Sequence, residues 1–221
     1  MRQQDIDRAV LGCTQAHRRL VDHLDGLLRA GALNPSSPSL LPNWSVAHVL
    51  VHLAANADSH VRVFDGAARG EVLDQYAGGF AARNAAIEEG VGKDAAQLVG
   101  EIGDSCARLE QAWAVAAERG WEGRWRSPLG PELAVTELPF RRWRETEVHH
   151  ADLGLDGFGF DDWSPEYVKR ELALRTIEWS SRQPMGMTSL PKAALQLSTT
   201  TRLAWLMGRV VPAGLEPVTF G

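Results

Sequence analysis

The sequence predicts a mainly α protein in which a helical region, residues 1–155, is followed by a smaller region of mixed α and β character, residues 156–221. Three observations support this division. Long segments of the first region place apolar residues three or four positions apart, which is the spacing of one helix face. Stretches that contain glycine and proline separate these segments. The run Gly-Leu-Asp-Gly-Phe-Gly at 154–159 has the composition of a loop and marks the expected boundary.

Five helices are predicted in the first region, at 4–30, 46–68, 79–89, 94–119 and 136–152. Gly31 is a natural end for the first helix, and Gly154 for the last. Ser45 is expected to cap the second helix, because a serine side chain accepts hydrogen bonds from the free amides of a first turn. The last helix tolerates Pro139 because it falls in the first turn.

Shorter elements are predicted elsewhere. Residues 121–135 hold a Pro/Gly turn between two β-capable pieces, which predicts a hairpin or an extended excursion. After the boundary, Ser164 and Pro165 are typical of a helix start. The second region is expected to contain helices at 166–181 and 201–208 and strands at 193–198 and 215–220.

The composition excludes several classes of protein. A chain of 221 residues with 44% hydrophobic and 23% charged residues can bury the core of one large domain or two small ones. A net charge of −5 argues against nucleic acid as the main partner, because phosphate binding needs a basic surface. The two cysteines, Cys13 and Cys106, give no disulfide framework. Without an apolar run of roughly 20 residues or a signal peptide, we expect a cytoplasmic protein with no membrane partner.

The second predicted helix carries a column of possible metal ligands. Four polar side chains lie four residues apart along it: His48, His52, Asn56 and His60. Imidazole is the commonest protein ligand for zinc. The alternative is that one histidine of such a pair caps the helix or is solvated, while the other is a hydrogen-bonded core residue.

The helix at 136–152 carries a second group. Five candidate ligands lie within eight residues: Glu145, Glu147, His149, His150 and Asp152. Glu145 and His149 are four apart, whereas Glu147 and His150 have the three-residue spacing seen in di-metal bundles. Spacing alone leaves both pairs open. The alternative is a solvated charged face paired with nearby arginines.

Two motifs resemble a known family. Trp44-Ser-Val-Ala-His-Val-Leu-Val-His-Leu-Ala-Ala-Asn-Ala and Arg144-Glu-Thr-Glu-Val-His-His-Ala-Asp-Leu-Gly resemble the mycothiol-dependent maleylpyruvate isomerases, of the DinB-like superfamily of metal-binding bundles. Leu206-Met-Gly-Arg resembles a Gly-Arg segment of that family's C-terminal domain. The resemblance implies a DinB-like four-helix bundle at 1–155, a small α+β domain at 156–221 and an actinobacterial source.

The resemblance also implies a metal site. It places the ligands of one zinc ion, or of another divalent metal, at His52, Glu145 and His149. The remaining candidates then become residues around the ligands or on the surface: His48, His60, Glu147 and His150. Three protein ligands leave a tetrahedral zinc ion with one open position, as in catalytic sites.

The implied activity uses mycothiol as a thiol cosubstrate. Its thiolate adds to the cis double bond of maleylpyruvate, an anionic electrophile, and its elimination leaves fumarylpyruvate. Arg209 is expected to position the dianion, and Arg144 is a second candidate that could instead pair with a glutamate. Asp152 either orients a ligand histidine for catalysis or caps the helix end. Asn56 either contacts the thiol or fills a polar position.

Other functions remain open from the sequence. The same site could transfer mycothiol to another electrophile, or activate water in a metal-dependent hydrolase. A metal-binding stress protein without catalysis is a further alternative. We expect a monomer or a homodimer that binds a small-molecule thiol and an anionic substrate.

Overall fold

The computed structural model describes residues 2–119, 121–184 and 189–218. The chain forms two compact units, Met1–Gly157 and Phe158–Gly221, and each is described by itself. The division lies two residues beyond the boundary that the glycine-rich loop predicts.

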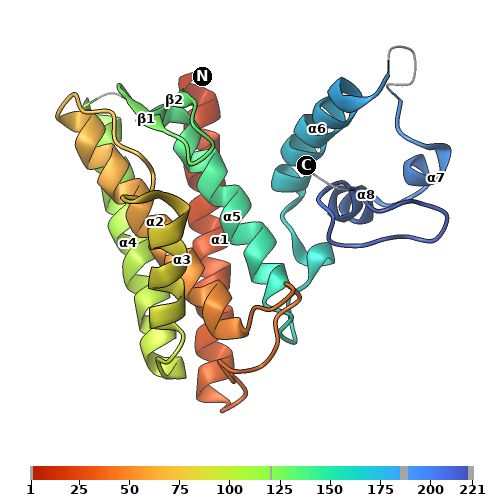
Figure 1. Ribbon diagram of the computed structural model, residues 1–221, viewed down its shortest axis with the longest axis horizontal. Helices are drawn as coiled ribbons and strands as arrows, with labels where there is room; N and C mark the ends of the chain where they lie inside the picture. The colour runs from red at the N-terminus through yellow and green to blue at the C-terminus, as the bar shows by residue number, and fades with distance from the viewer. Residues whose placement is uncertain (1, 120, 185–188, 219–221) are drawn as a thin grey trace. The chain divides into compact units, whose positions relative to one another are not determined.

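Four long helices form a bundle in the first unit (Figure 1). These helices are α1 (Gln3–Arg29), α2 (Val46–Ala68), α4 (Ala95–Arg119) and α5 (Leu138–Asp152). Helix α2 packs mainly along α4, and α1 packs mainly along α5. A shorter helix, α3 (Gly79–Gly90), packs mainly on α2. The five helices predicted for this region are therefore confirmed.

The start of α2 follows from its sequence. The Ser45 hydroxyl accepts a bond from the backbone amide of His48, and the His48 Nδ1 accepts one from the amide of Ser45, at 3.1 Å. This reciprocal arrangement satisfies two amides that a helix start otherwise leaves free. The predicted Ser45 cap is thus confirmed. Apolar residues then bury α2 around most of its circumference, which makes it the central helix of the unit.

A hairpin lies between α4 and α5. Strands β1 (Arg124–Arg126) and β2 (Glu132–Ala134) pair antiparallel, with Arg124 opposite Ala134. A 3-10 turn, η1 (Val135–Glu137), then leads directly into α5. The predicted hairpin is confirmed, and its Trp125 is only 1% exposed.

The second unit is helical in the residues that the structure describes. It contains η2 (Phe160–Asp162), α6 (Pro165–Arg182), α7 (Lys192–Leu195) and α8 (Thr199–Leu206). The Ser164 hydroxyl caps α6 as predicted, accepting a bond from the amide of Tyr167 at 3.3 Å.

The mainly α class is confirmed, but two strands expected in the second unit are not. Residues 192–195 form a helix, because a short Ala-Ala-Leu run has no periodicity that separates strand from helix and both residue types favour helices. Residues 215–218 form no strand, and the rest of that expected strand lies outside the described residues.

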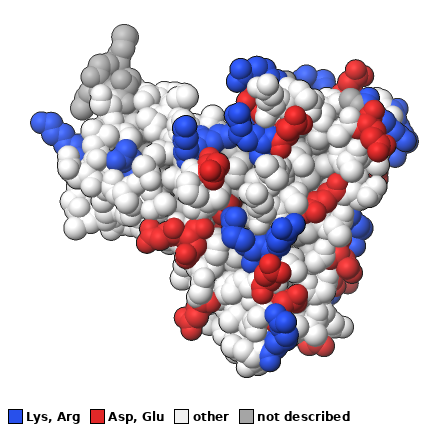
Figure 2. Space-filling model, turned by 180° about the vertical axis from the view of Figure 1, so that it is seen from behind, with Lys and Arg blue, Asp and Glu red and all other residues white. Residues whose placement is uncertain are grey.

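The described residues contain no candidate membrane span, and charges of both signs are mixed on one side of the molecule. None of the helices described is both long and apolar enough to cross a bilayer. On the side of the molecule that Figure 2 shows, Asp and Glu side chains lie among the Lys and Arg side chains. This mixture agrees with the net charge of −5.

Candidate metal centre

Three of the predicted ligands meet between α2 and α5. His52 projects from the second turn of α2, and Glu145 and His149 project from successive turns of α5. The His52 Nε2 lies 2.9 Å from the Glu145 Oε2, and the His149 Nε2 lies 3.5 Å from the same oxygen. One ligand atom from each residue lies within 4.8 Å of the others. Among the described residues, this is the one group of three or more such side chains that could hold a metal ion.

The geometry and donor set fit a divalent metal. Zinc bonds of about 2.0–2.2 Å to nitrogen and oxygen put the ligand atoms of a tetrahedral site roughly 3.5 Å apart. The two separations from the Glu145 oxygen, 2.9 and 3.5 Å, lie close to that value, and all three ligand atoms lie within 4.8 Å of one another. Small side-chain rotations would therefore close the site. Two imidazoles and one carboxylate also suit zinc chemically, and they leave one position open.

Asp152 fixes the orientation of one candidate ligand. Its carboxylate accepts a hydrogen bond from the His149 Nδ1 at 2.9 Å, and its own side chain is fully buried. This bond keeps the proton of a neutral His149 on Nδ1 and leaves Nε2 free to face the cluster. Burial alone would lower the pKa of His149, but the bonds to Asp152 and Glu145 outweigh it and raise the pKa to about 9.

The other two candidates have the protonation states that a metal site requires. Burial lowers the pKa of His52 to about 4, so its imidazole is neutral at pH 7. Burial alone would raise the pKa of Glu145, but hydrogen bonds from His149 and His52 hold it well below its usual range. A neutral imidazole and an ionised carboxylate are the forms that bind a cation.

Arg83 and Trp44 contact His52, and Tyr76 lies beside Arg83. The Arg83 Nη2 donates a hydrogen bond to the His52 Nδ1 at 2.8 Å. The guanidinium lies 5.7 Å from the ring centre of Trp44 and 5.8 Å from that of Tyr76. Trp44 also meets His52 edge to face, with ring centres 5.7 Å apart. The sequence patterns single out neither Arg83 nor Tyr76, since both lie outside the two motifs.

Glu147 and His150 lie away from this cluster. The Glu147 carboxylate accepts bonds from Arg19 at 2.6 Å and from the Trp143 indole at 2.9 Å. His150 lies 2.8 Å from a ring nitrogen of His23 on α1. Both residues are at least 98% buried, so a surface position, one of the two expected, is wrong. They belong to the α1–α5 contact.

The two remaining histidines of α2 also have other places. His48 caps the helix through its contacts with Ser45. His60 is buried, with its ring centre 6.5 Å from that of Trp125 in the hairpin. Their four-residue spacing from His52 therefore does not indicate metal binding, and the structure brings neither of them into the cluster.

Asn56 is bonded by protein groups at both ends of its amide. Its oxygen accepts a bond from Arg142 at 3.0 Å, and its nitrogen donates to the Tyr76 hydroxyl at 3.4 Å. The side chain is 3% exposed. These contacts favour the expectation that Asn56 fills a polar position over contact with a thiol.

The two predicted anion-binding arginines occupy different settings. Arg144 is half-buried on α5, with its guanidinium 5.4 Å from the ring centre of Phe140. Arg209 follows α8 in the second unit and donates a hydrogen bond to the backbone oxygen of Met207 at 3.1 Å. The preceding Gly208 has a φ of +69°, which favours glycine at the end of that helix.

A buried arginine joins all four bundle helices. Arg142 is fully buried and donates bonds to the Leu53 carbonyl on α2 at 2.8 Å and to the His17 Nε2 on α1 at 3.1 Å. It also approaches the Cys106 sulfur on α4 at 3.7 Å. His17 in turn bonds Glu110 at 2.9 Å. Sequence reasoning misses this network, because it treats the arginines of α5 as partners on a solvated face.

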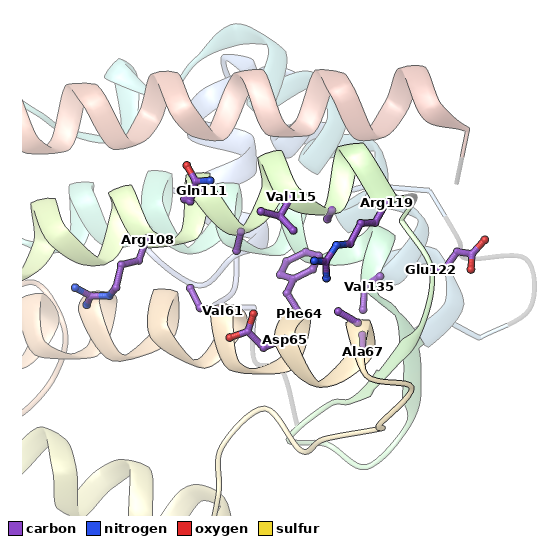
Figure 3. Close-up of a pocket in the computed structure, with 13 residues that line it drawn as sticks. Val61, Phe64, Asp65, Ala67, Arg108, Gln111, Val115, Arg119, Glu122 and Val135 are labelled. Carbon is purple, nitrogen blue, oxygen red and sulfur yellow. The ribbon is translucent and has the colours of Figure 1, made fainter.

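A separate pocket of about 450 Å³ lies between the C-terminal halves of α2 and α4 (Figure 3). Val115 and Arg119 extend from α4 toward Phe64 on α2. The pocket contains none of the three candidate ligands. Its walls are mainly apolar, so the convergent donor atoms of the metal site mark the stronger candidate for chemistry.

Comparison with known proteins identifies the family of the chain. The family model described as the mycothiol maleylpyruvate isomerase N-terminal domain matches residues 13–154, more than half of the chain. The chain belongs to this family. The matched residues include the three candidate metal ligands, His52, Glu145 and His149.

Two solved structures share the fold. A crystal structure of the mycothiol-dependent maleylpyruvate isomerase is 21% identical, with a TM-score of 0.76 over 93% of this chain and 90% of that one. A histidine-to-alanine mutant of that enzyme gives 20% identity and a TM-score of 0.77 over the same shares. At this identity the likeness shows the fold alone. A search of curated protein sequences found no match.

Proposed function

We propose that this protein is a zinc-dependent isomerase that uses mycothiol to convert maleylpyruvate to fumarylpyruvate. The observation that carries the proposal is the convergence of His52, Glu145 and His149, with Asp152 holding His149. Membership of the mycothiol maleylpyruvate isomerase family supports the choice of thiol and substrate. Another divalent metal could take the place of zinc.

The candidate ligands would hold the metal beside a site for the thiol. When bound, the metal supplies Lewis acidity that lowers the pKa of a thiol reaching its open position. Glu145 contributes one negative charge, and Asp152 keeps the Nε2 of His149 available. Neither cysteine of the chain competes as the nucleophile, because Cys13 and Cys106 are both buried.

The reaction needs a reversible addition. The thiolate forms a bond to one carbon of the cis double bond, and the electron pair moves into the conjugated carbonyl group. Rotation about the resulting single bond precedes elimination, which restores the double bond in the trans form and releases the thiol. Arginines would hold the carboxylates of the substrate through this rotation, and we propose Arg209 and Arg144 for that role.

The test combines metal analysis with turnover. We expect the zinc-loaded protein to convert maleylpyruvate only when mycothiol is added, and the amount of free thiol to be the same at the end. His52→Ala, Glu145→Ala and His149→Ala should each lose zinc and activity. His150→Ala is the matched control on α5: it should keep zinc, although it loses fold stability because His150 is buried.

Four results would contradict the proposal. Consumption of mycothiol would indicate a thiol transferase, and hydrolysis without thiol would indicate a hydrolase. A zinc-loaded protein without turnover of maleylpyruvate would favour a metal-binding protein with another role. Loss of zinc in His150→Ala but not in His149→Ala would show that the ligand set is wrong.

A further inference from the structure

Arg83 brings a positive charge to the candidate metal centre from outside both sequence motifs. It projects from α3, and its Nη2 donates to the His52 Nδ1 at 2.8 Å. Its other terminal nitrogen donates to the side-chain oxygen of Asn84 at 2.9 Å. The side chain is half-buried. Arg83 therefore reaches the site while part of it stays open to solvent.

Within the described part of the chain, no carboxylate lies within ion-pairing distance of Arg83. Its guanidinium carbon instead lies over two aromatic rings, 5.7 Å from the ring centre of Trp44 and 5.8 Å from that of Tyr76. Aromatic faces attract a cation and restrict its motion without neutralising it. The charge of Arg83 thus stays available to an anion from outside the protein.

A metal ion and Arg83 compete for His52. The His52 Nε2 faces Glu145, so a metal in this site would take the lone pair of Nε2. A neutral imidazole bound through Nε2 carries its proton on Nδ1. Arginine has donors and no acceptor, so it has no hydrogen bond to offer a protonated Nδ1. A metal ion bound to Nε2 would therefore leave Arg83 without its hydrogen bond to His52.

We propose that Arg83 binds a carboxylate of the electrophilic substrate once the metal has freed it from His52. This inference rests on the proposed function, because it takes the anionic substrate from there. A planar guanidinium binds a carboxylate through two parallel hydrogen bonds, and the nearby rings of Trp44 and Tyr76 attract the guanidinium without neutralising it. Arg83 is thus a substrate-binding residue that the metal makes available.

The test uses two measurements that need no turnover. Zinc affinity of the metal-free protein is measured by competition with a chelator, and binding of maleate to the zinc-loaded protein by calorimetry. Wild-type protein is compared with Arg83→Gln and Arg83→Lys. The control is Arg69→Gln, which removes an exposed arginine about 25 Å along α2 from His52.

We expect Arg83→Gln to bind zinc as tightly as the wild type or up to about tenfold more tightly, because a competing bond to His52 is gone. Its affinity for maleate should fall about tenfold to 100-fold, the effect of losing a charge-assisted pair. Arg83→Lys should fall between the two, and Arg69→Gln should match the wild type. In turnover, the KM for maleylpyruvate should rise while that for mycothiol stays unchanged.

Equal maleate affinity in the wild type and Arg83→Gln would overturn the inference, as would absence of maleate binding to the zinc-loaded wild type. A tenfold or greater loss of zinc affinity in Arg83→Gln would show instead that Arg83 supports the metal site. Maleate binding that depends on Arg83 without isomerase activity would contradict the proposed function alone. Activity with an unchanged KM in Arg83→Gln would contradict the inference alone.

Discussion

At the scale of single residues, two of the three candidate ligands have the protonation state that binds a cation, and His149 carries one proton too many. His52 is neutral and Glu145 is ionised at pH 7, but the bonds to Asp152 and Glu145 raise the pKa of His149 to about 9. A metal ion must displace that proton from His149. Metal affinity and pH are therefore coupled through this residue.

We predict that zinc affinity rises about tenfold per pH unit from pH 6 to 8 and levels off near pH 9. Affinity rises with pH because zinc binding releases a proton. Below about pH 9 the metal-free site carries an extra proton on His149, and the zinc-loaded site does not. Competition with a chelator of known pH dependence measures the slope. An affinity that does not change with pH would contradict the assignment of His149.

Asp152→Asn is the matched variant for this experiment. Loss of the carboxylate lowers the pKa of His149, so the rise in affinity should level off at a lower pH. The fully deprotonated site should also bind zinc about 10- to 100-fold more weakly, because the imidazole loses its charged partner. A variant with the same profile as the wild type would show that Asp152 only ends the helix.

Residue spacing alone predicts only part of this site. It brings Glu145 and His149 to one face of a helix, but it gives equal weight to Glu147 and His150, which lie against α1. The family resemblance removes that ambiguity. Arg83 contacts His52 across 31 residues of sequence, and no local pattern encodes such a contact.

At the scale of elements, close packing of α1 on α5 depends on a glycine. A Cβ atom added at Gly12 would lie 2.3 Å from the indole of Trp143. That indole is held in place by its bond to Glu147 and by an edge-to-face contact with Phe140. The two helices therefore approach at a distance that only glycine allows at this position.

We predict that Gly12→Ala lowers the free energy of unfolding by about 1–3 kcal/mol, because the methyl group overpacks the contact. Gly26→Ala in the same helix should raise it by about 0.5–1 kcal/mol, since nothing lies within 4 Å of the added methyl and alanine favours the helix. Urea unfolding of both variants measures the difference. Equal stabilities would show that Trp143 moves aside without cost.

The helices were predictable where their ends carry strong signals. Ser45 and Ser164 cap α2 and α6, and Gly31 follows α1 with a φ of +65°. The short elements were not, because the run at 192–195 has too few residues to show a period. The buried Arg142 was also unpredictable: its partners lie on three other helices, and a sequence shows only its charge.

At the scale of the whole molecule, the residues with proposed roles belong to two units. His52, Glu145, His149, Asp152 and Arg83 all belong to the first unit, whereas Arg209 belongs to the second. The sequence predicts this division from the glycine-rich loop at 154–159. Metal binding is thus expected to need the first unit alone, and isomerisation to need both.

We predict that a chain ending at Gly157 remains helical and binds zinc within about tenfold, or 1.4 kcal/mol, of the full chain. It should not isomerise maleylpyruvate, because the proposed contribution of Arg209 is missing. Circular dichroism and chelator competition measure the first outcome, and turnover measures the second. Loss of zinc affinity would show that the second unit stabilises the metal site.

The packing of α3 has a consequence for how substrate specificity can change during evolution. Helix α3 packs mainly on α2, and it supplies Arg83 while the loop before it supplies Tyr76. The ligand atoms come from other helices. Given the proposed role of Arg83, we expect substitutions confined to residues 70–91 to change which acids are bound while metal binding is retained. Paralogues with new substrates are therefore expected to differ first in this segment.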